Sequence, residues 1–120
     1  MIDHIGLRTA RFESSKQFFI AALTPLGIAP TVEYPGGVGF ARDGAPTFWL
    51  GESALAPSSM HLAFQAPSRA AVDAFYAAAL AAGATDNGGP GVRADYHANY
   101  YAAFVIDLDG NNVEAVCHLA

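Results

Sequence analysis

Apolar and polar residues alternate over several short stretches of the chain, whereas two longer stretches space their apolar residues three or four positions apart. Alternation predicts half-buried strands, and the longer spacing predicts amphipathic helices. The predicted strands cover residues 2–8, 28–34, 38–42, 46–50, 61–66, 102–106 and 113–117, and the predicted helices cover residues 13–23 and 69–82. Residues 85–99 are rich in glycine, so we expect a loop with one short strand there.

Turn and cap residues separate these elements. Gly36–Gly37 and Asp43–Gly44 have the composition of hairpin turns, because glycine and aspartate accept tight-turn backbone conformations. Ser68 is the expected N-cap of the second helix, and Ser14 or Ser15 that of the first. The small residues 53–59 are typical of a linker.

The chain repeats its own pattern. His4 and His61 stand 57 residues apart, and each begins an alternating segment that is followed by a helix and further strands. Four apolar or aromatic pairs coincide at this one offset: Ile5 with Leu62, Leu7 with Phe64, Phe18 with Phe75, and Phe19 with Tyr76. Repetition of a whole supersecondary unit predicts two related modules, residues 1–56 and 60–120, in one α+β domain. Pseudo-twofold pairing of the modules would place the two histidine strands in equivalent positions.

Composition narrows the functional classes. The chain has 120 residues, of which 52% are hydrophobic and 14% charged, and this is typical of a folded domain. Its formal net charge of −5 and its six scattered Lys and Arg residues argue against nucleic-acid binding. The single cysteine excludes an internal disulfide and favours a cytoplasmic location. No apolar run approaches the roughly 20 residues of a membrane span, and no signal sequence is expected.

The C-terminal hairpin carries an unusual carboxylate. Turn formers occupy residues 107–111, and Glu114 follows within an apolar strand, where a glutamate is solvent-facing, paired or bound to a ligand. Three strands therefore each offer one metal-ligand side chain: His4, His61 and Glu114. Two imidazoles and a carboxylate suit a divalent ion with open positions for water or substrate. Taken singly, each residue also fits an ordinary surface position.

Three motifs carry a resemblance to a known family: DHIGL at Asp3–Leu7, HLAF at His61–Phe64, and DLDGNNVEAV at Asp107–Val116. Through them the whole chain resembles the vicinal oxygen chelate superfamily, which includes glyoxalase I, bleomycin-resistance proteins, extradiol dioxygenases and fosfomycin-resistance enzymes. The resemblance implies two paired βαβββ modules that form a curled mixed sheet, with helices on its outer face. It also implies that His4, His61 and Glu114 bind a divalent metal ion (Fe, Zn, Ni, Mn or Co).

One departure from the family pattern bears on the reaction. Glyoxalase I-like members place a fourth ligand, usually glutamate, on the last strand of the first module. Here residues 47–50 contain no carboxylate, and the nearest one, Glu52, lies past the predicted strand. The remaining set resembles the two-histidine, one-carboxylate triad of extradiol dioxygenases.

Several further residues are candidates for acid–base chemistry or for the lining of the cup. We predict His97 and Tyr101 as catalytic groups; Tyr96 and Tyr100 are further candidates by residue type, and strand packing or an exposed loop is the alternative explanation for all four. The aromatic residues of the first half line the cup or pack in the core: Phe40, Phe48 and Trp49.

Two functions remain open at this stage. The first is a metal-dependent lyase, isomerase or dioxygenase, in which the ion acts as a Lewis acid on a small substrate with vicinal oxygens. The second is a bleomycin-resistance-type protein that sequesters a small molecule without catalysis. We expect a homodimer in either case, because family members commonly complete the site across two chains. Arg8 and Arg93 are single residues and do not indicate a charged substrate.

Overall fold

The computed structural model describes residues 1–55 and 59–120, so part of the predicted linker, residues 56–58, lies outside the described residues. The elements in chain order are β1 (Ile5–Thr9), α1 (Phe12–Leu23), the 3-10 turn η1 (Thr24–Leu26), β2 (Ala29–Tyr34), β3 (Gly37–Ala41), β4 (Phe48–Glu52), β5 (His61–Gln65), α2 (Arg69–Ala81), β6 (Thr85–Asp86), β7 (Gly91–Val92), β8 (Tyr101–Ile106) and β9 (Asn112–Cys117).

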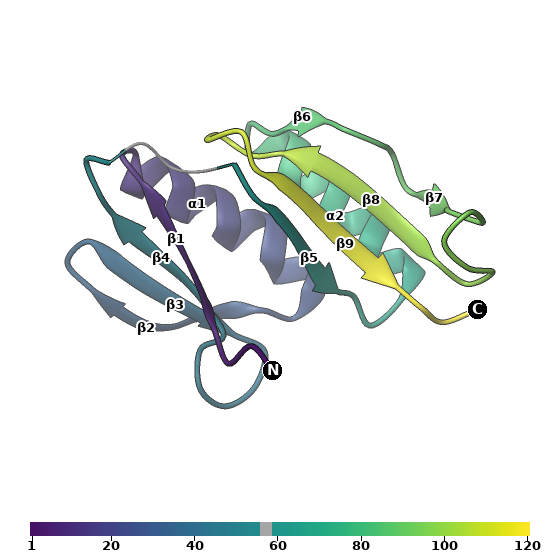
Figure 1. The fold of residues 1–120 in the computed structure, drawn as a ribbon, viewed down its shortest axis with the longest axis horizontal. Coiled ribbons are helices and arrows are strands. Elements are labelled where there is room, and N and C mark those ends of the chain that lie inside the picture. The colour runs from purple at the N-terminus through teal and green to yellow at the C-terminus, as the bar shows by residue number, and fades with distance from the viewer. Residues whose placement is uncertain (56–58) are drawn as a thin grey trace.

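The strands form two sheets with the same internal order. Sheet A runs β1-β4-β3-β2, and sheet B runs β5-β9-β8-β6, with β7 also paired to β8. β1 pairs parallel with β4 and β5 pairs parallel with β9, whereas the remaining pairs are antiparallel. Both helices lie behind the sheets in Figure 1, and the front of the strands carries no helix. The predicted α+β fold with helices on one face is confirmed.

One hydrophobic core joins the two halves. It lies between the sheets and the helices, and it includes Phe18 and Phe75, which are equivalent in the repeat and are both buried. Phe48 of sheet A meets Phe64 of sheet B edge to face, with ring centroids 5.3 Å apart. Phe40 and Phe48 therefore belong to the core.

The start of α1 differs from the prediction. The helix begins at Phe12, so Ser14 and Ser15 lie inside it, and its N-cap, Arg11, makes no side-chain capping bond. Phe12 is buried in the core, and this packing favours a helix that begins at Phe12, before the predicted start. The predicted cap of α2 is confirmed, because Ser68 accepts a hydrogen bond from the Ala71 backbone. The glycine-rich segment holds two short strands, β6 and β7, instead of one.

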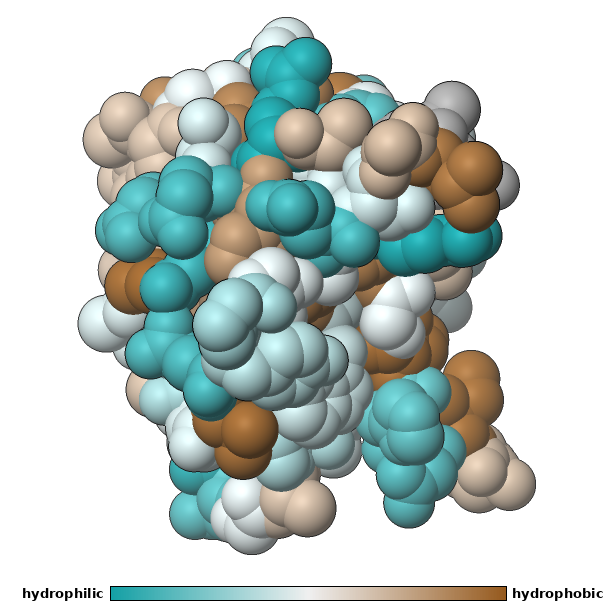
Figure 2. Space-filling model, turned by 90° about the vertical axis from the view of Figure 1, so that its left-hand side faces the viewer, coloured by the Kyte–Doolittle hydropathy of each residue, from teal (hydrophilic) through white to brown (hydrophobic). Residues whose placement is uncertain are grey.

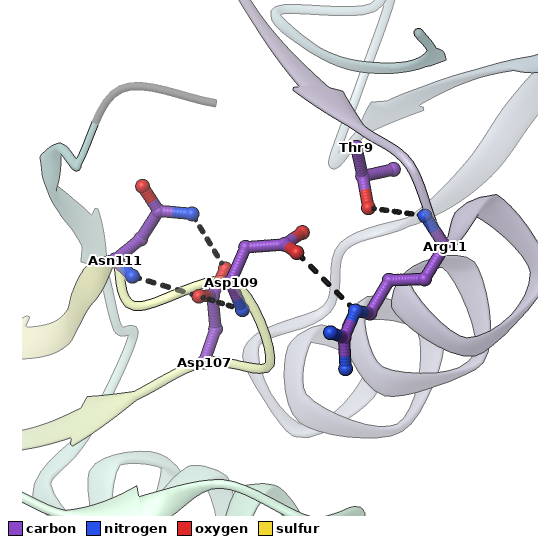
Figure 3. Close-up of polar contacts among 5 residues, drawn as sticks. All are labelled: Thr9, Arg11, Asp107, Asp109 and Asn111. Carbon is purple, nitrogen blue, oxygen red and sulfur yellow. Dashed lines mark hydrogen bonds and ion pairs between the residues drawn. The ribbon is translucent and has the colours of Figure 1, made fainter. Parts of the chain in front are cut away.

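The turn between β8 and β9 fixes the position of the last strand (Figure 3). The buried carboxylate of Asp107 accepts hydrogen bonds from the backbone N–H groups of Asp109 and Asn111 and from the Asn111 side-chain amide. Asp109 in turn contacts the Arg11 guanidinium, at 3.5 Å, beside the start of α1. A turn with this many bonds permits only one hairpin register, and a slip of one residue would reverse which side chains of β9 face the front of the sheet.

The surface nearest sheet A is mixed in character. Figure 2 shows hydrophobic residues there in separate patches among hydrophilic and intermediate ones. Val32 and Tyr34 of β2 are among the exposed large hydrophobic residues. In the described part of the chain, neither helix has the length and apolar character that crossing a membrane requires.

Candidate functional site

His61 and Glu114 meet on the front of sheet B. β5 and β9 are adjacent, with His61 opposite Asn112 and Ala63 opposite Glu114, so the two side chains extend from neighbouring strands on the same face. His61 Nε2 lies 2.9 Å from Glu114 Oε2. The Glu114 side chain is 2% exposed and that of His61 is 54% exposed. The Glu114 carboxylate is therefore buried, and its partner His61 is exposed to solvent.

Tyr100 holds the other oxygen of the same carboxylate. Its hydroxyl donates a hydrogen bond to Glu114 Oε1. Burial, then the hydrogen bond to Glu114 and the charge of that carboxylate, raises the pKa of Tyr100 to about 12. Tyr100 is therefore a neutral donor at any ordinary pH, and it fixes the orientation of the carboxylate.

Two histidines extend this cluster on the far side of Tyr100. His97 Nε2 lies 2.8 Å from His118 Nδ1, and the Asn99 backbone N–H donates to His97 Nδ1. The second bond leaves the proton of a neutral His97 on Nε2, from which it is donated to His118. Both imidazoles meet the Tyr100 ring edge to face, at centroid distances of 5.2 and 5.3 Å. Sequence reasoning had not selected His118 as a site residue, although it shares the alternation of Glu114 and Val116.

Tyr101 lies on the opposite face of sheet B from Glu114. Its hydroxyl donates to Asp73 Oδ1 of α2 at 2.6 Å, and the Arg69 guanidinium lies 5.0 Å from its ring centroid. The hydrogen bond to Asp73 raises the pKa of Tyr101. The structure thus places Tyr101 in the contact between sheet and helix, and it places Tyr100 beside the carboxylate.

His4 lies apart from the other two predicted ligands. It precedes β1, is exposed, and has its Nδ1 2.7 Å from Asp3 Oδ1. It lines a groove of about 510 Å³ on the front of sheet A, together with Arg8 and Trp49. Across residues 1–55 and 59–120, no three His, Cys, Asp or Glu side chains converge as a metal site would require.

Trp49 occupies the position in sheet A that Glu114 occupies in sheet B. Gly6 and Ala63 are equivalent in the repeat, and the β1–β4 register pairs Gly6 with Trp49 just as the β5–β9 register pairs Ala63 with Glu114. Glu52 is three residues beyond Trp49 on β4, so it points to the opposite face. The described residues of sheet A therefore supply no carboxylate at the position equivalent to Glu114.

His61 and Glu114 are residue types that bind divalent metal ions, but two ligands from one chain do not complete a metal site. An imidazole nitrogen and a buried carboxylate oxygen that already lie within 2.9 Å are suitable ligand types. Tyr100 supplies the hydrogen bond that commonly orients a ligating carboxylate. His61 and Glu114 can thus provide two positions, and a further ligand has to come from elsewhere.

Comparison with known families matches residues 1–115 to the Glyoxalase/Bleomycin resistance protein/Dioxygenase superfamily. The chain belongs to this superfamily. The resemblance predicted from the sequence motifs is therefore confirmed.

Three solved structures resemble the chain over nearly its whole length. A glyoxalase/bleomycin resistance protein from Albidiferax ferrireducens T118 is 31% identical, with 95% of each chain covered and a TM-score of 0.82. A family enzyme from Burkholderia phytofirmans PsJN is 20% identical, with 98% of each chain covered and a TM-score of 0.74. The oxidase ChaP-H2 is 19% identical, with 98% of this chain and 92% of that chain covered and a TM-score of 0.70. The last two similarities establish the fold alone. Comparison with curated proteins found no match.

Proposed function

We propose that this protein is a divalent-metal-dependent enzyme of the superfamily, a lyase, isomerase or dioxygenase, that acts on a small substrate with vicinal oxygens. The observation that carries the proposal is the pair formed by His61 and Glu114: their ligand-type atoms lie 2.9 Å apart, and Tyr100 orients the buried carboxylate of Glu114. A structural role alone does not require a buried carboxylate paired with an exposed imidazole.

The third ligand in this proposal is His4 of a second copy of the chain. His4 is exposed at the end of the groove on sheet A and is free of His61 and Glu114 in its own chain. A twofold dimer would bring sheet A of one copy to sheet B of the other twice, because a twofold interface repeats each contact. Two identical sites would result, each with residues from both copies.

Each residue has a defined task in such a site. A bound divalent ion would accept two neighbouring oxygens of the substrate and stabilise negative charge that develops on them. Glu114 would supply a carboxylate oxygen and His61 an imidazole nitrogen, while the Tyr100 hydroxyl keeps the carboxylate from rotating. His97 and His118, which share a hydrogen bond beyond Tyr100, would be the groups that exchange a proton with a substrate.

Mixed dimers test the metal site and its assembly together. His4→Ala and Glu114→Gln proteins are each prepared, mixed after mild denaturation and refolding, and assayed for bound Zn²⁺ and Mn²⁺ by elemental analysis. Each parent protein lacks one ligand in every site, so both should bind little metal. In a site that spans two chains, a mixed dimer contains one site with both defects and one intact site, so mixing should restore binding.

The outcomes separate the parts of the proposal. Metal binding restored by mixing supports a site shared between chains. No restoration, when the wild-type protein binds metal, overturns the shared site and leaves a site within one chain. Absence of stoichiometric metal in the wild-type protein after supplementation overturns the metal-dependent function. A monomer at micromolar concentration by light scattering overturns the dimer.

A second function is favoured by one observation. Trp49 and Tyr34 line the open groove on sheet A, with ring centroids 6.2 Å apart, and such an aromatic wall suits non-catalytic capture of a small molecule. Ligand affinity that is unchanged in the Glu114→Gln protein would favour this bleomycin-resistance-type function. In either case we propose a reducing, cytoplasmic location, because Cys117 is free and buried.

A further inference from the structure

Glycines of sheet A lie against two aromatic rings that line the groove. A Cβ atom at Gly39 would lie 2.9 Å from two ring atoms of Trp49, and a Cβ atom at Gly37 would lie 2.3 Å from the ring of Tyr34. The two aromatic rings therefore rest directly on the backbone of β3, which only glycine permits at this separation. Gly6 and Gly51 also line the groove, so side chains project into it from few positions. The result is an open aromatic platform with space above it.

Arg8 provides a positive charge beside this platform. It lines the groove and lies opposite Gly51 in the β1–β4 pairing, two residues along the same face from Gly6. Among the described residues Arg8 has no ion pair within 4.0 Å, whereas Arg11 pairs with Asp109 and Lys16 with Glu33. Asp3 contacts His4, which also lines the groove. An arginine without a carboxylate partner, next to two aromatic rings, suits an anionic aromatic ligand.

We propose that the groove binds a planar aromatic carboxylic acid, whose ring packs on Trp49 and Tyr34 and whose carboxylate pairs with Arg8. Ring packing on a fixed aromatic pair favours flat ligands over saturated ones of the same size. A guanidinium favours a carboxylate over a neutral hydroxyl, because charge-assisted hydrogen bonds are roughly twice as strong as neutral ones. Both preferences follow from residues of a single chain.

In the proposed enzyme this aromatic acid would be the substrate class, so that part of the inference rests on the proposed function. In the proposed dimer the groove, with His4 at its end, faces the His61 and Glu114 pair of the second copy. The aromatic acid would then be held by sheet A while its reacting oxygens reach sheet B. Binding itself does not need the metal, so it can be measured separately.

Trp49 is the only tryptophan in the chain, and its fluorescence reports directly on the groove. The full-length protein is titrated in a chelator with benzoate, with benzyl alcohol as the neutral aromatic probe, and with cyclohexanecarboxylate as the saturated acid. Benzoate should change the Trp49 emission saturably and bind more tightly than either other probe. The difference between benzoate and benzyl alcohol should be about tenfold, which is the scale of one charge-assisted hydrogen bond.

Two variants and one control locate the contacts. Arg8→Gln should lower benzoate affinity about tenfold and leave benzyl alcohol unchanged. Gly39→Ala should weaken both aromatic probes, because its methyl group would meet both Pro46 and the Trp49 ring at under 3.0 Å and displace the ring. Arg69→Gln, which removes an arginine that contacts Tyr101 on the helix side, should change neither affinity.

Three results would overturn the inference: no saturable response to benzoate, equal affinity for cyclohexanecarboxylate, or equal loss of affinity in the Arg8 and Arg69 variants. Its failure is distinct from failure of the proposed function. Benzoate binding without any metal loading would overturn the metal-dependent enzyme alone, and metal loading without benzoate binding would overturn the aromatic-acid groove alone.

Discussion

Trp49 and Glu114 occupy equivalent register positions in the two sheets, one as an aromatic wall and the other as a buried acid. Trp49 lies on β4 opposite Gly6 of β1. Glu114 lies on β9 opposite Ala63 of β5, which is equivalent to Gly6 in the repeat. A site assembled from both sheets would thus be asymmetric, with ligand atoms concentrated on sheet B and ring surface on sheet A. This asymmetry distinguishes the chain from the four-ligand glyoxalase I pattern.

Replacing Trp49 by glutamate should tighten divalent-metal binding. The new carboxylate would stand at the position equivalent to Glu114 and supply a fourth ligand in the proposed shared site. We expect an increase in Zn²⁺ affinity of about tenfold or more, the scale of one charge-assisted contact. Isothermal titration with Zn²⁺ measures it, with Trp49→Gln as the matched neutral variant. Equal affinities in the two variants would show that Trp49 does not face the metal site.

Removal of the Tyr100 hydroxyl should loosen Glu114. In Tyr100→Phe one oxygen of a buried carboxylate loses its donor, and we expect unfolding to become easier by about 1–3 kcal/mol. Metal affinity should fall about 10–100-fold, as for other groups that orient a ligand. Urea denaturation and metal titration measure the two effects. Tyr101→Phe is the control, because it breaks only the bond to Asp73 and should leave metal affinity unchanged; a loss equal to that of Tyr100→Phe would contradict the assignment.

The contact between Tyr100 and Glu114 should also set an upper pH limit on the stability of the fold. Burial, with the hydrogen bond to Glu114 and the charge of that carboxylate, raises the pKa of Tyr100 from 10.0 to about 12, so the stability linked to its protonated hydroxyl is fully present below pH 10 and is lost as the pH rises through about 12. In a spectroscopic titration of phenolate absorbance, the difference between wild type and Tyr100→Phe should therefore develop near pH 12. A difference that is complete near pH 10 would show that Tyr100 is not held by Glu114.

The sequence predicted the fold well because its repeat is ungapped over elements that supply core residues. The offset of 57 residues relates the first strand and helix of each half, and the paired residues Phe18 and Phe75 are buried alike. The offset of 57 residues does not hold at the last strand of each half. Trp49 and Glu114 stand 65 residues apart, because the second half has a longer segment before β8. Their equivalence therefore emerges only from strand register, which is a tertiary property.

The choice between Tyr100 and Tyr101 illustrates the same limit. Neighbouring residues of a strand face opposite sides, so one of the two had to face Glu114 and the other the helix. Which one does so depends on the β8–β9 register, in which Phe104 lies opposite Glu114. Residue type identified both tyrosines as candidates, and the catalytic prediction named Tyr101, which contacts Asp73. Whether His97 or His118 moves a proton stays a prediction.

Asp107 should be the residue on which the register of β9 depends most. Asp107→Ala leaves the buried Asn111 backbone N–H and side-chain amide without their acceptor, so we expect a loss of about 2–3 kcal/mol in the free energy of unfolding. Asp107→Asn keeps one carbonyl acceptor and should lose less. Asp43→Ala, in the exposed turn between β3 and β4, is the matched control and should change stability by less than about 0.5 kcal/mol. Urea denaturation compares all three, and similar midpoints for Asp107→Ala and Asp43→Ala would show that the turn does not hold Glu114 in place.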